Sequence, residues 1–321
     1  MSEGGLPPAG GAGAALKPVQ KLGLALSGSV DPTPFLKRVK AEADRLGIEL
    51  WVEQETIDRA QGGEDYRPLT VQVPIDAMLV LGGDGTLLRV GRTLVGRSVP
   101  MMGVNLGNLG FLTGAGPSEV IDAVGWLARG EFTVEERTTL EGTFPDLPDQ
   151  APLVALNDIV LHKSGTHRIV RLRLRVGPEG REEDLGGFSG DGVIVASPTG
   201  STAYNLSAGG PIVAPSVDCF TVTPIAAHTL SARPLVFAGK DSVVIVPAEP
   251  DPNLMVTVDG VDTMQINGVH GIRVGKGEGT LLLARPENRG WVETLRRKLQ
   301  WAARPVGDAY DDFDDSTTSG H

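Results

Sequence analysis

The sequence predicts an α/β domain with a parallel sheet, followed by a second, mainly β domain. The chain has 321 residues, which is enough for each domain to bury its own core. The first part alternates short apolar runs with helical patterns, whereas from about Phe132 short β-branched runs follow one another. In an α/β domain of this kind, a ligand is expected at the carboxyl ends of the parallel strands.

The α/β domain is expected over residues 21–131, with helices on both faces of its sheet. Short apolar runs predict its strands, and apolar residues at helical spacing predict its helices. The first helix has Pro34 near its start and Gly47 at its end, in line with the usual preferences of helix ends. The expected strands span 22–26, 48–52, 75–81 and 100–104, and the expected helices span 31–47, a stretch after Thr86, and 118–129.

The mainly β domain is expected over residues 132–287, followed by a C-terminal helical segment over 288–303. The two ends of the chain, 1–20 and the acidic stretch 304–321, carry few large apolar side chains and are expected to be disordered. The amphipathic part of the C-terminal helix spans 291–301. The expected strands span 132–143, 153–162, 169–176, 192–197, 242–247, 254–258 and 280–284.

Composition argues against several kinds of partner and site. The net charge of -11 disfavours nucleic acids and anionic membranes, because both are bound largely through excess Lys and Arg. Cys219 is the single cysteine, so neither an intramolecular disulfide nor a Cys-based zinc site can form. The sequence has no apolar run of about 18 residues and no signal-peptide pattern in its first part. We therefore expect a soluble, cytoplasmic protein with no nucleic-acid or membrane partner.

Gly82-Gly83-Asp84-Gly85-Thr86 follows the third predicted strand and precedes a helix. Glycines let the backbone approach phosphates closely, and the amides of a helix start bind anions. The Asp84 carboxylate can then accept a hydroxyl proton during phosphoryl transfer, while most of the rate comes from positioning and charge neutralisation. A tight turn that needs positive φ angles is the alternative. Neither a P-loop nor a Gly-x-Gly-x-x-Gly fingerprint is present, which argues against a Walker ATPase and a Rossmann dehydrogenase.

Two further motifs combine polar side chains with apolar strands. The loop 105–113 contains two asparagines and two glycines that can frame a planar heterocycle, with Phe111 stacking on it or simply packing in the core. Asn157 and Asp158 interrupt the apolar run 153–161, where buried polar groups need partners. An amide that reads a base and a carboxylate that accepts from ribose hydroxyls would supply them. The alternative is a turn at a strand end.

The longest motif spans residues 190–211, where a buried strand opens into a turn rich in hydroxyl groups and glycines. Small hydroxyl donors and exposed amides suit a purine edge and a ribose, and Tyr204 can stack on a base. A purely structural turn is the alternative, although such a turn needs few special residues.

These motifs, with His-Thr-Leu-Ser-Ala-Arg-Pro at 228–234, resemble in order the successive motifs of bacterial NAD kinases, over residues 21–301. The Gly-Gly-Asp-Gly-Thr element alone also resembles phosphofructokinases and the diacylglycerol and sphingosine kinases. The Ser-Pro-Thr-Gly-Ser-Thr-Ala-Tyr run together with Ser-Ala-Gly-Gly-Pro is specific to the NAD kinases. The sequence is therefore identified as a member of that family.

The resemblance implies a Rossmann-like α/β N-terminal domain, a β-sandwich C-terminal domain, and an active site in the cleft between them. It also implies a homodimer or homotetramer in which a neighbouring subunit helps complete the site. The implied reaction transfers the terminal phosphoryl group of ATP to the adenosine 2'-hydroxyl of NAD, giving NADP and ADP. Mg²⁺ would be bound mainly through the nucleotide phosphates, with no metal ligand from the protein.

The resemblance also assigns roles to individual residues. Asp84 is implied to be the proton acceptor, Asp191 to contact the nicotinamide end, and Phe111 to line the same pocket. Asn157 and Asp158 would bind the adenine and ribose groups of the dinucleotide. The adenosine region would be bound by Thr199, Thr202, Ala203 and Tyr204. The full set of expected ligand-binding residues is Gly83, Gly85, Thr86, Arg89, Phe111, Asn157, Asp158, Arg168, Asp191, Thr199, Thr202, Ala203, Tyr204 and Ser207.

Two departures from the family pattern affect the expected site. The family usually has Asn-Glu where this chain has Asn157-Asp158, and many members have an arginine where this chain has Ser189. Another cation would then have to neutralise the phosphates, although a charged residue of this kind is more often an ordinary solvated surface charge. The candidate cations are Arg89, Lys163, Arg168 and Arg233.

Two other functions stay open on the sequence alone. A lipid kinase would share the Gly-Gly-Asp-Gly-Thr element and would need a membrane-binding face. A non-catalytic dinucleotide-binding sensor would keep Tyr204 and Asn157 and would have no use for Asp84.

Overall fold

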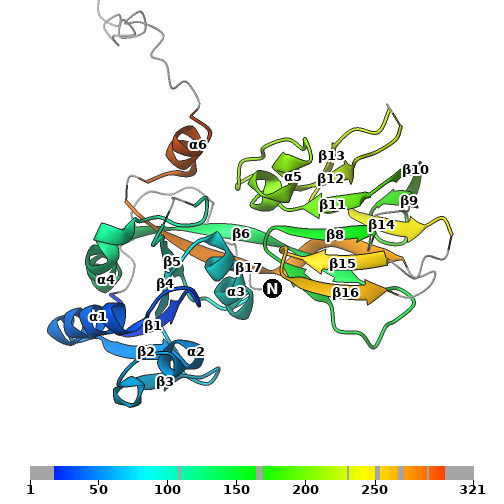
Figure 1. Ribbon diagram of the computed structural model, residues 1–321. Helices are drawn as coiled ribbons and strands as arrows, with labels where there is room; N and C mark the ends of the chain where they lie inside the picture. Colours follow the sequence, from blue (N-terminus) through cyan, green and yellow to red (C-terminus); the bar gives the residue numbers. More distant parts are fainter. Residues whose placement is uncertain are drawn as a thin grey trace, which may run out of the picture.

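The computed structural model describes residues 18–107, 110–163, 169–229, 231–249, 254–266, 271–287 and 289–300. The ends that the sequence predicts to be disordered lie outside these residues, except for 18–20. The described chain forms an α/β part and a two-sheet β part, joined by two long strands that run between them (Figure 1). Among the described residues, no helix combines the length and apolar character needed to cross a bilayer.

The α/β part has a parallel sheet in the order β5-β4-β1-β2-β3. Its strands are β1 (Lys21–Leu26), β2 (Glu49–Glu53), β3 (Arg67–Leu69), β4 (Ala77–Leu81) and β5 (Met101–Val104). The helices and short 3-10 turns are α1 (Thr33–Leu46), α2 (Gln54–Asp58), η1 (Gly63–Asp65), α3 (Asp84–Leu94), η2 (Pro117–Glu119) and α4 (Val120–Arg129).

Both faces of the parallel sheet are covered by helices, as the sequence predicts. Apolar residues of α1 and α4 pack against one face in a single core cluster, and those of α3 pack against the other. The helix ends also follow the sequence signals, since Gly47 and Gly130 adopt left-handed conformations just after α1 and α4.

The β part is a sandwich, which confirms the predicted fold class. One sheet has the order β13-β12-β11-β8-β15-β16, and in the other β9, β10 and β14 join β17, β6 and β7. The first sheet contains β8 (Asp158–Lys163), β11 (Gly192–Ala196), β12 (Cys219–Ile225), β13 (Leu235–Ala238), β15 (Leu254–Val258) and β16 (Asp262–Ile266). The second contains β6 (Phe132–Thr143), β7 (Leu153–Ala155), β9 (Val170–Gly177), β10 (Glu183–Gly190), β14 (Ser242–Pro247) and β17 (Ile272–Pro286). The short η3 (Gly200–Thr202) and α5 (Tyr204–Ser207) follow β11, and α6 (Trp291–Leu299) ends the described chain.

The strand β17 belongs to both parts of the molecule. Near its end, Leu283 and Ala284 pair in parallel with β5, whereas its first residues pair with β14 of the sandwich. Along its length it pairs with β6. The sheet therefore continues across residue 132, where the sequence places the boundary between the domains.

The predicted strand over 153–162 is wrong, because the structure divides it between the two sheets. β7 pairs with β6, β8 pairs with β11 and β15, and the chain bends at Leu156 and Asn157 between them. The predicted strand over 280–284 is only the end of the 15-residue β17. Strands β3, β10, β12, β13 and β16 were not predicted.

Candidate active site

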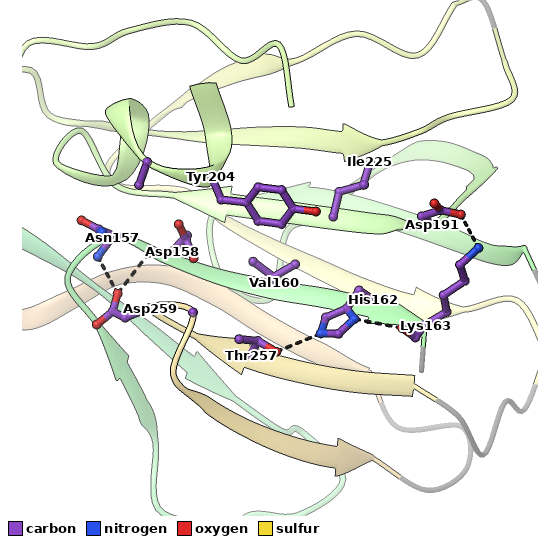
Figure 2. Close-up of a pocket in the computed structure, with 12 residues that line it drawn as sticks. Asn157, Asp158, Val160, His162, Lys163, Asp191, Tyr204, Ile225, Thr257 and Asp259 are labelled. Atoms are coloured by element: carbon purple, nitrogen blue, oxygen red, sulfur yellow. Dashed lines mark hydrogen bonds and ion pairs between the residues drawn. The ribbon is translucent and has the colours of Figure 1, made fainter. Parts of the chain in front are cut away.

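A cavity of about 470 Å³ lies on the face of the six-stranded sheet that points away from the other sheet (Figure 2). Ile159 and Leu161 of β8 enter the core between the sheets, so Val160 and His162 face the cavity by alternation. The lining residues are Asn157, Asp158, Val160, His162, Lys163, Asp191, Ala203, Tyr204, Ile225, Thr257, Asp259 and Gly260. Five of the expected ligand-binding residues, namely Asn157, Asp158, Asp191, Ala203 and Tyr204, therefore share this cavity with the candidate cation Lys163.

Residues 156–158 form a turn between two sheets, and two side chains hold its backbone. The Asp259 carboxylate accepts N–H groups from Leu156 (3.1 Å) and Asn157 (2.7 Å). On the other side, the Ser197 hydroxyl donates to the Leu156 carbonyl (2.5 Å), and the Ser197 N–H donates to the Asn157 carbonyl (2.9 Å). The turn is therefore fully hydrogen-bonded, which leaves the Asn157 amide free to face the cavity.

Asp158 is an unusual acid because its side chain is buried beside a second carboxylate. It is 3% exposed, and burial together with the Asp259 charge raises its pKa from the ordinary 3.8 to about 7. Burial also raises the pKa of Asp259, while hydrogen bonds from the backbone of Asn157 and Leu156 and the charge of Arg92 act in the opposite direction. The charge of the cavity floor therefore changes near neutral pH.

We expect this buried acid to make the protein less stable as pH rises. Between pH 3.8 and about 7 the folded state binds a proton at Asp158 that the unfolded state has released, so the free energy of unfolding falls with rising pH. Replacing Asp158 with asparagine should flatten this slope in urea denaturation between pH 5 and 8. The exposed Asp149→Asn is the charge-matched control and should keep the wild-type slope. An unchanged slope in the Asp158 variant would show that Asp158 titrates normally.

The far end of the cavity carries an ion pair and an ordered histidine (Figure 2). The Lys163 ammonium lies 2.5 Å from the Asp191 carboxylate. The ring of His162 contacts the Lys163 carbonyl through Nδ1 (2.9 Å) and the Thr257 hydroxyl through Nε2 (2.8 Å). Since a carbonyl only accepts, the neutral ring carries its proton on Nδ1 and accepts the Thr257 hydroxyl proton at Nε2. The histidine thus has a fixed orientation in the wall.

The sequence suggests that the hydroxyl groups of the turn after β11 bind a ligand, but several of them form hydrogen bonds within the protein. Ser201 bonds to the carbonyls of Pro198 and Val213, and the buried Asn205 binds the hydroxyls of Thr221 and Thr223. Thr199, Thr202 and Ser207, all expected to bind ligand, lie in this segment but do not line the cavity. The Tyr204 ring is 46% exposed beside the cavity, as a stacking surface requires.

Asp84 is the first residue of α3, and its carboxylate is fixed by the backbone of the loop after β5. It accepts the N–H groups of Phe111 (2.8 Å) and Leu112 (3.1 Å). Gly110 is required for this contact, because a Cβ there would lie 1.9 Å from a carboxylate oxygen of Asp84. Asn108 and Leu109 of the loop lie outside the described residues.

Gly83 and Gly85, the two glycines next to Asp84, leave open space. None of Gly82, Gly83 and Gly85 has a positive φ, so the interpretation as a turn that needs left-handed residues is wrong. A Cβ at Gly82 would contact Thr86 at 2.6 Å, whereas a Cβ at Gly83 or Gly85 would meet nothing within 4 Å. The start of α3 therefore presents accessible backbone to a ligand.

Asp84 does not line the cavity, but α3 connects it to the cavity floor. The other end of α3 packs against Leu156, and a Cβ at Gly91 would lie 2.9 Å from that side chain. Arg92, also near that end, has its Nε 3.9 Å from the Asp259 carboxylate. From Asp84 to Arg92 the helix rises about 12 Å.

Both polar backbone groups of Phe111 are hydrogen-bonded. Its N–H binds Asp84, and its carbonyl accepts a hydrogen bond from the buried Arg285 (2.7 Å). The Lys298 ammonium of α6 lies 5.0 Å from the centre of its ring. The ring is not part of the lining of the cavity, so its expected place there stays a prediction.

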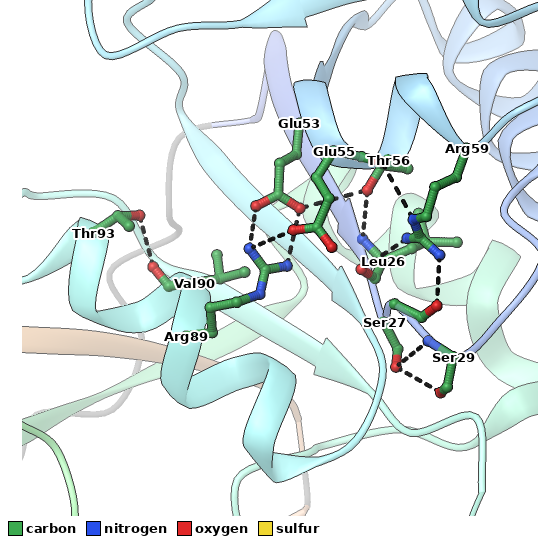
Figure 3. Close-up of polar contacts among 11 residues, drawn as sticks. Leu26, Ser27, Ser29, Glu53, Glu55, Thr56, Arg59, Arg89, Val90 and Thr93 are labelled. Atoms are coloured by element: carbon green, nitrogen blue, oxygen red, sulfur yellow. Dashed lines mark hydrogen bonds and ion pairs between the residues drawn. The ribbon is translucent and has the colours of Figure 1, made fainter. Parts of the chain in front are cut away.

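The candidate cations occupy different environments. Arg89 is held by Glu53 at 2.5 and 3.0 Å and lies 3.5 Å from Glu55, and the hydrogen bond to Glu53 raises its pKa (Figure 3). Arg233 lines a separate cavity of about 230 Å³, and Arg168 lies outside the described residues. Lys163 alone among the described candidates lines the cavity of about 470 Å³.

Sequence reasoning missed several lining residues, most notably His162, Thr257 and Asp259. Successive side chains of β8 point to opposite faces of the sheet. Once the bounds of the strand are known, this alternation places Asp158, Val160 and His162 on one face. Asp259-Gly260 directly follows a predicted strand, which is the usual position of a functional turn.

Comparison with known proteins agrees with the geometry. Residues 52–132 match the family model of the ATP-NAD kinase N-terminal domain, and residues 156–285 match that of the ATP-NAD kinase C-terminal domain. The chain is 40% identical over 276 residues to the NAD kinase of Gemmatimonas aurantiaca, covering 85% of this chain and 93% of that protein. It is 35% identical over 260 residues to the NAD kinase of Syntrophotalea carbinolica, covering 80% and 90% respectively.

Solved structures show the same fold. The crystal structure of yeast NADH kinase complexed with NADH superimposes with a TM-score of 0.78 at 22% identity, covering 90% of this chain and 89% of that one. An NAD kinase from Archaeoglobus fulgidus in complex with ATP gives a TM-score of 0.64 at 26% identity, covering 85% and 99%. On the strength of the two family models and these relatives, the chain belongs to the NAD kinase family.

Proposed function

We propose that this NAD kinase transfers the terminal phosphoryl group of ATP to the adenosine 2'-hydroxyl of NAD, giving NADP and ADP. The main support is one arrangement. The Asn157-Asp158 turn and Tyr204 line a single cavity, and the helix that packs against this turn begins with Asp84. In the reaction, the 2'-oxygen forms a bond to the terminal phosphorus and the bond from that phosphorus to ADP breaks. Asp84 accepts the hydroxyl proton.

The cavity has a matching group for each part of the dinucleotide. Tyr204 offers an exposed ring for the adenine, and the Asn157 amide reads the base edge. Asp158 bonds to ribose hydroxyls, although its side chain is one methylene shorter than the usual glutamate. Lys163, paired with Asp191, supplies positive charge toward the pyrophosphate and nicotinamide end. It thereby takes the place of the arginine that Ser189 replaces.

We propose that Mg²⁺ reaches this site bound to the nucleotide phosphates. Within the described residues, no group of three or more His, Cys, Asp and Glu side chains is placed to hold a metal ion. Mg²⁺ commonly takes most of its ligands from substrate phosphates and water. When bound, it neutralises phosphate charge.

We propose that the ATP phosphates lie over Gly83 and Gly85, and Gly85→Ala tests this. A Cβ at Gly85 meets nothing within 4 Å and lies in the first turn of α3, so stability should stay unchanged or rise by about 0.5–1 kcal/mol. The KM for ATP should rise about tenfold because the methyl group fills the space for phosphate, while the KM for NAD stays the same. If the variant melts at the wild-type temperature and its KM for ATP is unchanged, the phosphates do not lie over Gly85.

One coupled assay tests the function as a whole. Purified protein is incubated with NAD, ATP and Mg²⁺, and NADP is measured with an NADP-specific dehydrogenase. NAD binding without NADP formation would favour a sensor, and phosphorylation of lipid in vesicles would favour a lipid kinase. Replacing ATP with other triphosphates or polyphosphate, and NAD with NADH, defines the donor and acceptor range.

We propose that the protein acts in the cytoplasm as a homodimer or homotetramer. Exposed apolar side chains on β10 and β13, such as Leu185, Leu235 and Val236, support association between copies. Light scattering coupled to gel filtration measures the state directly.

A further inference from the structure

We propose that Asp259 is a positioning residue for NAD, because its carboxylate holds the Asn157-Asp158 turn and links that turn to α3 through Arg92. The inference rests on the proposed function, since it concerns how the same dinucleotide site is kept in shape. Asp259 has no part in the expected motifs and does not need to touch the reacting atoms. Its effect on substrate is exerted through Asn157 and Asp158.

The first observation is the number of backbone groups that depend on this one carboxylate. Its side chain is fully buried, and it accepts N–H groups from Leu156, Asn157 and Asp158, the last at 3.3 Å. In return, the Asp259 N–H donates to the Asp158 carbonyl at 3.0 Å. Leu156 and Asn157 lie between β7 and β8, outside both strands, so no ladder partner binds their N–H groups. Without Asp259 they would be left buried and unsatisfied.

The backbone of Asp259 supports the same arrangement. Its φ is 51°, in the left-handed region, and Gly260 follows with a φ of 69°. The turn after β15 thereby directs the carboxylate back under residues 156–158 (Figure 2). Among non-glycine residues, Asp and Asn tolerate this conformation best. Asparagine is therefore a substitution that removes the charge without straining the turn.

The second observation is the link to α3. Arg92 is 19% exposed and lies 3.9 Å from the Asp259 carboxylate, two turns beyond Asp84 on the same helix. The negative charge of Asp259 therefore faces both the arginine of α3 and the carboxyl group of Asp158. The other charged or titratable groups that line the cavity near Asp158 are His162, Lys163 and Asp191. Removing the Asp259 charge should change the dependence of NAD binding on pH, which a purely structural substitution would not do.

The test compares Asp259→Asn with the charge-matched control Asp149→Asn in the full chain. The Kd for NAD of the Asp259 variant should rise about tenfold, because charge-assisted hydrogen bonds to the turn become neutral ones. The pH at which NAD binding changes should move downward, since a negative neighbour of Asp158 has been removed. The kcat at saturating NAD should change less than the Kd. The control should match the wild type in all three.

Two results would overturn the inference. One is an Asp259→Asn protein with wild-type Kd and pH profile, and the other is a protein that only loses thermal stability while its folded fraction binds NAD normally. A double-mutant cycle with Arg92→Gln adds an independent measurement, and we expect non-additive effects on the Kd. Additive effects would show that Asp259 and Arg92 are not coupled and would contradict the proposed link to α3. If the wild type itself forms no NADP, the proposed function fails instead, so the two failures are distinguishable.

Discussion

Replacing Asp84 with asparagine is expected to lower kcat by about 10²- to 10⁴-fold while NAD still binds. The asparagine oxygen can still accept one of the N–H groups of Phe111 and Leu112, so the loop keeps its place. The amide cannot take up a proton from the 2'-hydroxyl. Turnover is measured by NADP formation, and binding by calorimetry with NAD alone.

The control for this substitution is Asp122→Asn, which removes an exposed acid from α4 and should leave kcat unchanged. Gly110→Ala tests the same carboxylate without replacing it. The added Cβ would lie 1.9 Å from the Asp84 carboxylate and displace it, so kcat should fall in this variant too. A kcat for Asp84→Asn equal to that of the wild type would remove Asp84 from the mechanism.

Gly200→Ala is expected to damage both stability and NAD binding. Its Cβ would lie 2.0 Å from the carbonyl oxygen of Asn157 and 2.4 Å from the carbonyl carbon, so main-chain atoms must shift. Overpacking of this kind costs about 1–3 kcal/mol. The shift also displaces the Asn157-Asp158 turn from its place between the Ser197 segment and Asp259, and we expect the NAD Kd to rise at least tenfold. Urea denaturation and calorimetry measure the two effects.

Gly290→Ala is a suitable control, since a Cβ there meets nothing within 4 Å and its φ is −79°. Because Gly290 caps the start of α6, where glycine is preferred to alanine, stability should fall by at most about 1 kcal/mol, and the NAD Kd should equal that of the wild type. If Gly200→Ala kept wild-type stability and affinity, the close contact between the two turns would not exist in solution.

The regular elements of the fold could largely be predicted from the sequence because local patterns determine them. The strands that became β1, β4 and β5 are continuous apolar runs, and α1 has clear signals at both ends. The missed strands lack such patterns. β10 contains adjacent glycines, and three of the four residues of β13 are exposed or nearly so, so both depend on pairing with distant partners.

The break between β7 and β8 could not be predicted, for a different reason. The run 153–162 is locally an ordinary strand, but the acceptor for its Leu156 N–H is Asp259, 103 residues later in the chain. The same distance explains why the cavity was incompletely predicted. Thr257 and Asp259 reach the site only because β15 pairs with β8, with Thr257 opposite Val160. Motif chemistry identifies residues within a segment, and strand pairing supplies the rest.

The sequence also could not show which charged residues face the cavity. Arg89 follows Asp84 closely and was a reasonable phosphate ligand, yet Glu53 at the end of β2 binds it. Lys163 was one of four equal candidates until β8 placed it in the cavity wall. Which cations face a ligand depends on tertiary contacts that a single sequence does not contain.

The long β6–β17 ribbon restricts how the enzyme can move. The two strands are paired from Phe132 with Pro286 at one end to Thr143 with Arg273 at the other, with one irregularity near Lys276. A jaw-like rotation of the α/β part against the sandwich would stretch this shared ladder of backbone hydrogen bonds. We therefore expect only small movements between the two parts when substrates bind.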